Sequence, residues 1–262
     1  MANLEDSWDD LWDEPSTPFS FTPLFIAAQT GDNIEVVRLL SMKVTPDGYD
    51  HSTLKKILED LPLDADLPYP LHVAAYNGHV ETVKILLRAN AYVGYQNIFR
   101  EDAISAAVWN GEEEVLDVLL NALEDEIRSD ILRKTASYHQ TLVMKAFEND
   151  LNVKVQASII GKLVSAKCDI NQTTYDTLNT TALIHAAETN NAEIVQILLD
   201  AKADMTIQRC DFIGPRDSIS ALEVATNCGH TEVVRILSEH QEGQRGGHQG
   251  GLQCGGGANA EQ

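Results

Sequence analysis

The chain has 262 residues, of which 44% are hydrophobic, so it is long enough to bury an extended core. Its 40 acidic and 19 basic residues give a formal net charge of −21 at pH 7, which argues against nucleic acid or an anionic membrane as partner. Such acidity favours solubility or a partner protein with a basic surface. The four cysteines lack paired spacing, and no apolar run reaches the roughly 18 residues of a membrane span. The acidic start is also unlike a signal peptide. We therefore expect a cytoplasmic or nuclear protein, monomeric, without a disulfide framework or zinc site.

Residues 1–20 form an acidic segment that contains Trp8, Leu11 and Trp12 and no basic residue. Such a composition is typical of disorder, although two exposed tryptophans are costly to leave in water. Two interpretations stay open. The aromatic side chains could fold back as a cap over the next element, or the segment could be a linear motif. Trp8 to Leu11 resembles the aromatic-x-x-aliphatic motif that docks on ubiquitin-like autophagy modifiers by strand addition, and also the tryptophan-acidic motifs bound by kinesin light chains.

An internal repeat organises the rest of the chain, and residues 70–87 are its clearest copy. This copy predicts a short helix with small Ala74 and Ala75 on its buried side, a break at Gly78, and a second helix with one apolar stripe. Gly78 lies 33 residues before Gly111 of the next copy. Two helices this short cannot bury their apolar faces alone, so the copies must stack. In chain order, the two halves of the six copies are 22–31 and 35–40, 70–78 and 80–87, 102–111 and 114–120, 141–150 and 159–164, 181–190 and 193–199, and 220–229 and 230–237.

This pattern resembles the ankyrin-repeat family, through residues 22–24, 70–72, 78–79 and 229–230. The resemblance implies an all-α solenoid of about six helix-turn-helix repeats with short hairpin fingers, over residues 21–240. Irregular insertions are expected at 41–68 and 121–158, where the connections are longer than the family needs. The fourth copy also departs from the family, because it has Asp150 in place of the turn glycine.

The resemblance also implies which residues bind a partner. In the family, the two residues after the paired alanines and the hairpin tips line the concave face. Carried over, the candidate contacts are Tyr76, Asn77, Trp109, Asn110 and Glu188 from the helices and Ile98, Phe99, Arg100 and Leu178 from the hairpins. Tyr76, Phe99 and Trp109 should lie close together, and exposed aromatic residues beside an arginine are typical of a binding hot spot. Alternatively, Trp109 or Phe99 packs inward to fill space beside irregular neighbours.

Two further expectations come from the same resemblance. Residues 163–171 resemble the acceptor sequence of the asparaginyl hydroxylase that modifies ankyrin domains, with Asn171 as the acceptor, although an Asp-aliphatic-Asn sequence also closes such hairpins structurally. His72, His79 and His230 occupy positions that are structural in the family, so we expect no metal site.

The sequence lacks a nucleophile–base pair, a phosphate-binding glycine loop or paired carboxylates at recognisable spacing. We therefore expect no enzyme activity and no cofactor, but a protein-interaction module that acts as an adaptor or scaffold. The alternatives are an inhibitor or regulatory subunit of an enzyme, a secreted bacterial effector acting on host proteins, and an enzyme concealed in residues 121–178. Residues 241–262 are rich in glycine and are expected to be a disordered tail.

Overall fold

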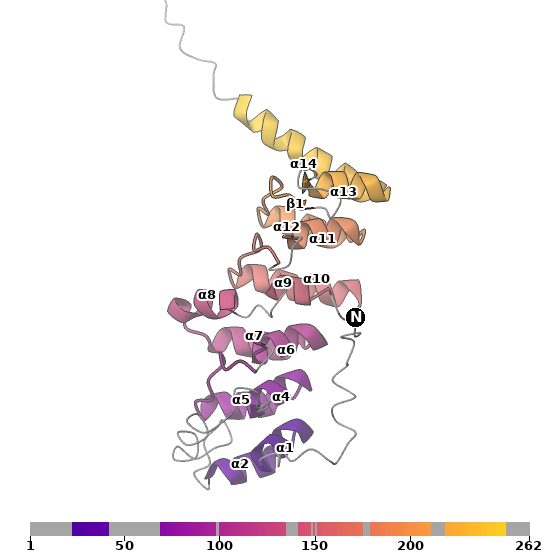
Figure 1. The fold of residues 1–262 in the computed structure, drawn as a ribbon. Coiled ribbons are helices and arrows are strands. Elements are labelled where there is room, and N and C mark those ends of the chain that lie inside the picture. The colour runs from indigo at the N-terminus through magenta and orange to yellow at the C-terminus, as the bar shows by residue number, and fades with distance from the viewer. Residues whose placement is uncertain are drawn as a thin grey trace, which may run out of the picture.

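The structure, a computed structural model, describes residues 23–41, 69–97, 100–134, 141–147, 149, 151–174, 179–210 and 218–249. Within these residues the helices stack in pairs along one axis, from α1 at one end to α14 at the other (Figure 1). The first helix of each pair is called inner here and the second outer. The inner helices are α1 (Pro23–Thr30), α4 (Pro70–Tyr76), α6 (Ala103–Asn110), α9 (Leu142–Lys145), α11 (Ala182–Glu188) and α13 (Ala221–Cys228). The outer helices are α2 (Asn33–Ser41), α5 (Val80–Arg88), α7 (Glu113–Ala122), α10 (Val153–Ser165), α12 (Ala192–Asp200) and α14 (Thr231–Gln249).

Five of the helix pairs fold back on themselves at a described residue with left-handed backbone geometry, which is Gly31, Gly78, Gly111, Asn190 or Gly229. Gly78 has φ 71° between α4 and α5, and its missing side chain makes this conformation inexpensive. A Cβ there would also collide with the carboxylate of Glu112 at the start of α7. In the fifth repeat Asn190 takes the equivalent position with φ 59°, because asparagine tolerates this region better than most residues.

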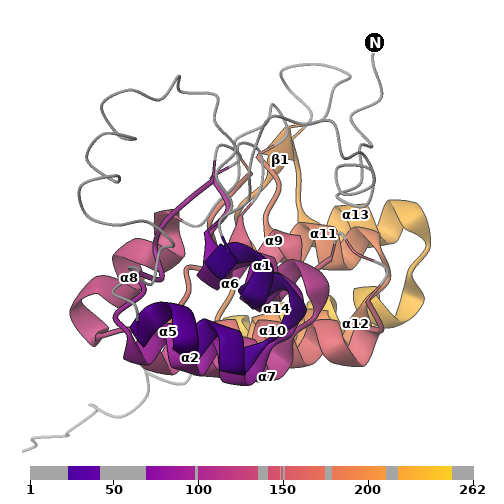
Figure 2. The ribbon, with the colours of Figure 1, turned by 90° about the horizontal axis from the view of Figure 1, so that it is seen from below.

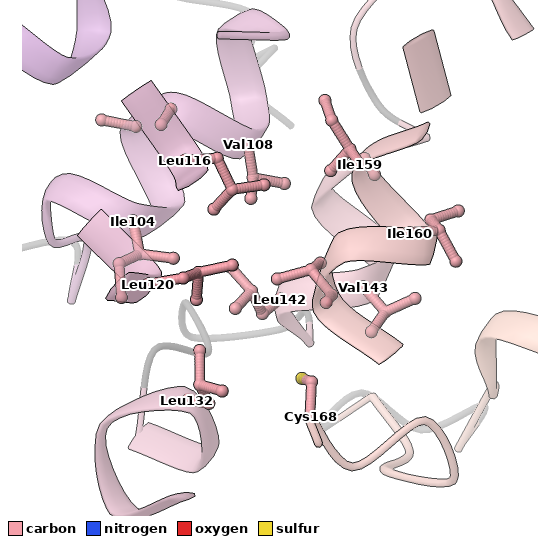
Figure 3. Packing of buried hydrophobic residues seen from close by; sticks show 14 of the residues in the cluster. Ile104, Val108, Leu116, Leu120, Leu132, Leu142, Val143, Ile159, Ile160 and Cys168 are labelled. Atoms are coloured by element: carbon pink, nitrogen blue, oxygen red, sulfur yellow. The ribbon is translucent and has the colours of Figure 1, made fainter. Parts of the chain in front are cut away.

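The core runs without interruption along the stack. Ala74, Ala75 and Ala107 are fully buried, which lets neighbouring inner helices pack closely. The third and fourth repeats meet around Ile104, Val108, Leu116, Leu120, Leu132, Leu142, Val143, Ile159, Ile160 and Cys168, whose side chains gather in one cluster (Figure 3). Seen along the stack, the outer helices α2, α5 and α7 lie on one side, and β1 (Arg209–Cys210) lies on the opposite side (Figure 2). β1 pairs antiparallel with β2 (Ser218–Ile219) in the finger before α13.

Two segments differ from the expected layout, the start of α10 and the end of α14. Within the predicted insertion at 121–158, α8 (Asp125–Lys134) projects beside the stack, and α10 already begins at Val153, where the Asn152 side chain accepts a hydrogen bond from Lys154 N. Residues 153–158 therefore belong to the outer helix of the fourth repeat. At the other end, α14 continues to Gln249 through part of the expected tail, since its glutamine, glutamate and arginine residues favour helix between the glycines. The predicted insertion at 41–68 and the segment 1–20, including Trp8, Leu11 and Trp12, lie outside the described residues apart from Ser41.

Candidate partner-binding surface

The aromatic residues of the second and third repeats surround a small buried space. Tyr76 ends α4 and Trp109 lies in the last turn of α6, and both line a cavity of about 10 Å³ together with His72, Glu101 and Ser105. Both aromatic side chains are half-buried. The structure thus brings Tyr76 and Trp109 together, whereas Phe99 lies outside the described residues.

A buried ion pair fixes the position of Trp109. Lys145 comes from α9, and its Nζ lies 5.3 Å from the centroid of the Trp109 ring, a cation–π geometry. The same ammonium donates to Glu101 Oε1 at 2.5 Å. The Lys145 and Glu101 side chains are only 3% and 17% exposed, so this charge pair is largely shielded from water.

His72 borders this charge pair as a neutral ring. Burial lowers the pKa of His72 from 6.5 to about 4, a shift that Glu101 opposes and Lys145 reinforces. The folded protein therefore keeps the His72 imidazole uncharged at pH 7 and in mildly acidic solution, as long as the pH stays above the lowered pKa. The cavity therefore carries one compensated ion pair and no further charge from His72 at neutral pH.

Side-chain hydrogen bonds join consecutive repeats at the ends of the inner helices. Asn110 Nδ2 donates to the carbonyl of Tyr76 at 2.6 Å, and Asn149 Nδ2 donates to the carbonyl of Trp109 at 3.0 Å. A histidine ring serves at two other junctions: His79 Nε2 lies 2.8 Å from Gln29 O, and His230 Nε2 lies 2.9 Å from Glu188 O. The two asparagine bonds hold the backbone on which Tyr76 and Trp109 are presented.

Glu188 is occupied by a partner from its own chain. Its carboxylate accepts two hydrogen bonds from Arg209 of β1, at 2.7 and 3.0 Å. This bidentate contact lowers the pKa of Glu188 below its ordinary value, so the side chain stays ionised well into the acid range. Nearby, the rings of Phe147 and His185 meet edge to face with centroids 4.8 Å apart.

The other candidate residues are more scattered. Asn77 and Arg100 are exposed, and Asn77 Nδ2 donates to Val73 O of its own helix at 2.8 Å. Ile98 and Leu178 lie outside the described residues. Partner contact by these residues and by Glu188 stays a prediction.

Asn171 bridges two consecutive fingers. Its side-chain oxygen accepts a hydrogen bond from Asp204 N at 2.8 Å, and its own backbone N–H donates to Asp169 Oδ1 at 3.0 Å. The side chain is therefore used structurally in the folded chain, and its hydroxylation stays a prediction.

The sequence analysis missed Lys145 and Arg209 as members of these clusters. A signal for Lys145 is present in the repeat alignment, where it takes the position that Val73 and Ala106 take in the two preceding copies. A lysine at a buried apolar position requires a buried anion. Arg209 lacks such a signal, because it lies in a finger where exposed charges are ordinary.

Other site classes can be assessed for the part of the chain that the structure describes. None of its helices is long and apolar enough to cross a membrane. In the same residues, no three histidine, cysteine, aspartate or glutamate side chains converge in a way that could hold a metal ion.

Comparison with known proteins identifies the family. A family model described as ankyrin repeats (3 copies) matches residues 41–135 and again residues 143–246. The chain is an ankyrin-repeat protein. The predicted all-α ankyrin solenoid is confirmed by this match and by the stacked helix pairs. Ankyrin repeats generally mediate protein–protein interactions.

Several solved structures resemble this ankyrin-repeat protein over most of its length. A chain from the structure of the Bd0816 predatory endopeptidase of Bdellovibrio bacteriovorus in complex with immunity protein Bd3460 is 25% identical, with a TM-score of 0.56 over 84% of this chain and 99% of that one. The ankyrin repeat domain of Bcl-3, a member of the IkappaB protein family, is 24% identical with a TM-score of 0.60, over 84% and 86% of the two chains. An ankyrin repeat domain from Acinetobacter baumannii AYE is 22% identical with a TM-score of 0.64, over 84% and 97%.

Proposed function

We propose that this ankyrin-repeat protein is a non-catalytic adaptor that binds a partner protein through Tyr76, Asn77, Trp109 and Asn110, named here the Trp109 surface. The observation that carries the proposal is the fixed, half-buried indole of Trp109 beside Tyr76, with Lys145 on its ring. Large aromatic side chains that are rigid before binding lose little conformational entropy in a complex, and such residues dominate binding energy at protein interfaces.

The binding proposal is tested by affinity capture from eukaryotic lysate with the full chain and two variants. Trp109→Ala should weaken partner capture by about 30-fold, the effect of removing a hot spot worth about 2 kcal/mol. Ile34→Ala is the matched control, because Ile34 is an apolar residue of α2 that is 84% exposed and distant in sequence from the Trp109 surface. A partner that Trp109→Ala loses and Ile34→Ala retains supports the proposal. If every captured protein is retained by Trp109→Ala, the proposal is wrong.

A second candidate function is inhibition or regulation of an enzyme. It is favoured by the similarity to a chain from a complex between an endopeptidase and an immunity protein. The two functions are separated by assaying a captured enzyme with and without an excess of this chain. Loss of its activity, restored by Trp109→Ala, would assign the inhibitor function, whereas unchanged activity would leave the adaptor function.

A further inference from the structure

Three tyrosines form one aromatic cluster at the finger between the second and third repeats. The Tyr69 and Tyr95 rings are stacked, with centroids 4.9 Å apart and planes 10° apart. The Tyr92 ring meets Tyr95 edge to face at 5.1 Å. Tyr92 and Tyr95 are nevertheless 49% and 37% exposed, so much of the aromatic surface faces water. These three residues are named the tyrosine platform.

The first of these tyrosines replaces a helix cap. At the start of α9, α11 and α13, the hydroxyls of Thr141, Thr181 and Ser220 accept a backbone N–H from the first turn, and Asp102 caps α6 in the same way. Tyr69 holds the equivalent position before α4 and makes no such side-chain bond. Such a cap is worth about 1 kcal/mol, so this stabilisation is absent from the second repeat.

The second tyrosine replaces a turn-forming aspartate. Two residues after the left-handed residues Lys167 and Lys202, the carboxylates of Asp169 and Asp204 accept the backbone N–H two residues further on. Tyr92 follows the left-handed Asn90 by the same interval, and a phenol cannot make this tight turn contact.

The backbone is adapted to the Tyr92 ring. Gly94 follows two residues later, and a Cβ at this position would lie 3.0 Å from the ring atoms of Tyr92. Any residue larger than glycine would therefore require the Tyr92 ring to shift slightly. Tyr69 stands in place of a capping hydroxyl, Tyr92 stands in place of a turn aspartate, and Gly94 leaves room for the Tyr92 ring. Together these three features produce an exposed aromatic cluster.

We propose that the tyrosine platform is a second contact surface, which binds an arginine-rich segment of the partner protein. The proposal rests on the proposed adaptor function and extends it to a site beyond the Trp109 surface. Electron-rich tyrosine faces attract guanidinium groups, and the stacked pair offers them a rigid surface. Residues 91–97 carry no charge and lie between the exposed Arg88 and Arg100, so the attraction of a basic segment comes from the chain as a whole, which carries −21. Loss of local stabilisation at an exposed site is a common consequence of selection for binding.

The test exchanges the platform for the residues that the chain itself has at the equivalent positions around its fifth repeat. The triple variant Tyr69→Thr, Tyr92→Asp, Tyr95→Gln copies Thr181, Asp169 and Gln172. It should fold with an unchanged or higher Tm, because it restores a cap and a turn. The probe is a ten-residue peptide of alternating arginine and glycine, and its affinity for the full chain is measured by calorimetry at 0.15 M salt. We expect the triple variant to bind it at least about tenfold more weakly.

The direction of this change separates ring recognition from general electrostatics. The triple variant is more acidic than the native chain, so charge attraction alone would strengthen peptide binding. Tyr92→Phe retains the ring and should bind as the native chain does. Unchanged or tighter binding by the triple variant would overturn the proposal, as would a clear fall in its Tm, because the tyrosines would then be structural.

Two further comparisons complete the test. A peptide with citrulline in place of arginine keeps the shape without the charge and should bind at least about tenfold more weakly. If the citrulline peptide, or a proline-rich peptide, binds as tightly as the arginine peptide or more tightly, the inference that the partner segment is arginine-rich is wrong. Ile34→Ala, a change outside both surfaces, should leave peptide affinity unchanged. The adaptor function fails if lysate capture survives Trp109→Ala, and the platform inference fails if peptide binding survives the triple variant, so the two failures are distinguishable.

Discussion

Among the ion pairs that join repeats in the described part of the solenoid, two that involve inner helices differ in their access to water. Lys145 and Glu101 connect the fourth repeat to the finger before the third, with side chains 3% and 17% exposed. Arg209 and Glu188 connect the finger before the sixth repeat to the fifth, with side chains 14% and 38% exposed. A charge left behind in the first site lacks water to replace its partner, whereas the second site lets solvent compensate part of the loss. Breaking the Lys145–Glu101 pair should therefore cost more stability than breaking the Arg209–Glu188 pair.

Removing Lys145 should have the largest effect. Lys145→Met retains most of the side-chain volume but leaves the Glu101 carboxylate without its positive partner in a shielded site. We expect the free energy of unfolding to fall by about 3 kcal/mol, measured by urea denaturation. The double variant Glu101→Gln, Lys145→Met removes both charges and should recover much of this loss. Equal losses in the single and double variants would show that the charge pair is not the cause.

Acidification should next destabilise the first of these regions through His72. The unfolded chain binds a proton at His72 near pH 6.5, whereas burial holds the folded-state pKa at about 4. Protons therefore favour the unfolded chain in this window, and the stability present above pH 6.5 is lost as the pH falls towards 4. Between pH 7 and pH 5 the loss should be about 2 kcal/mol. His72→Gln should remove this part of the pH dependence, and a variant with the native pH profile would contradict the assignment.

The turn glycines provide a matched comparison of the same regions. Gly78 and Gly229 have φ 71° and 75°, so alanine should cost about 1 kcal/mol of backbone strain at either position. A Cβ at Gly78 also meets the Glu112 carboxylate, whereas a Cβ at Gly229 has no atom within 4 Å. Because the Glu112 carboxylate is the end of a flexible side chain that can rotate away, we expect Gly78→Ala to lose about 1.5 kcal/mol in total and Gly229→Ala about 1. The losses of stability are compared by thermal unfolding of the two variants. Equal losses would mean that the Glu112 side chain moves aside freely.

The smallest effect is expected from Glu188. Glu188→Gln keeps the shape and some hydrogen bonding to Arg209, and the site is partly solvated, so the loss should be about 0.5 kcal/mol. Because Arg209 lowers the pKa of Glu188, its contribution is present above pH 4.5 and is lost as the pH falls through the folded value. Native and variant stabilities, compared by urea denaturation at pH 7 and pH 3, should therefore converge at the lower pH. A loss at pH 7 as large as that of Lys145→Met would contradict the difference between the two regions.

The repeat order and helix positions were predictable because they depend on local patterns. Paired alanines, a turn glycine and an apolar stripe recur within about ten residues of one another, as for Ala74, Ala75 and Gly78. The same alignment placed Tyr76 and Trp109 on adjacent repeats. The Lys145–Glu101 pair was not predicted, because it joins residues 44 positions apart. A lysine in an irregular copy is also more readily interpreted as a break in the repeat pattern than as a buried charge. The start of α10 was missed because its first turns lack the apolar stripe of the other outer helices.

The repeat junctions also determine how the solenoid should respond to a pulling force. Around the second, third and sixth repeats, directional hydrogen bonds cross from one repeat to the preceding one, as from His79, Asn110 and His230. In the fifth repeat the equivalent polar side chains bond within their own repeat: Thr189 to His185 O and Asn191 to Thr189 Oγ1. The ring contact between Phe147 and His185 crosses this junction instead, and rings in contact can slide without breaking a directional bond. In the fingers, Asp204 N after α12 still donates to the Asn171 side chain after α10. Under load we therefore expect the inner helices of the fourth and fifth repeats to slide against each other while the fingers stay joined.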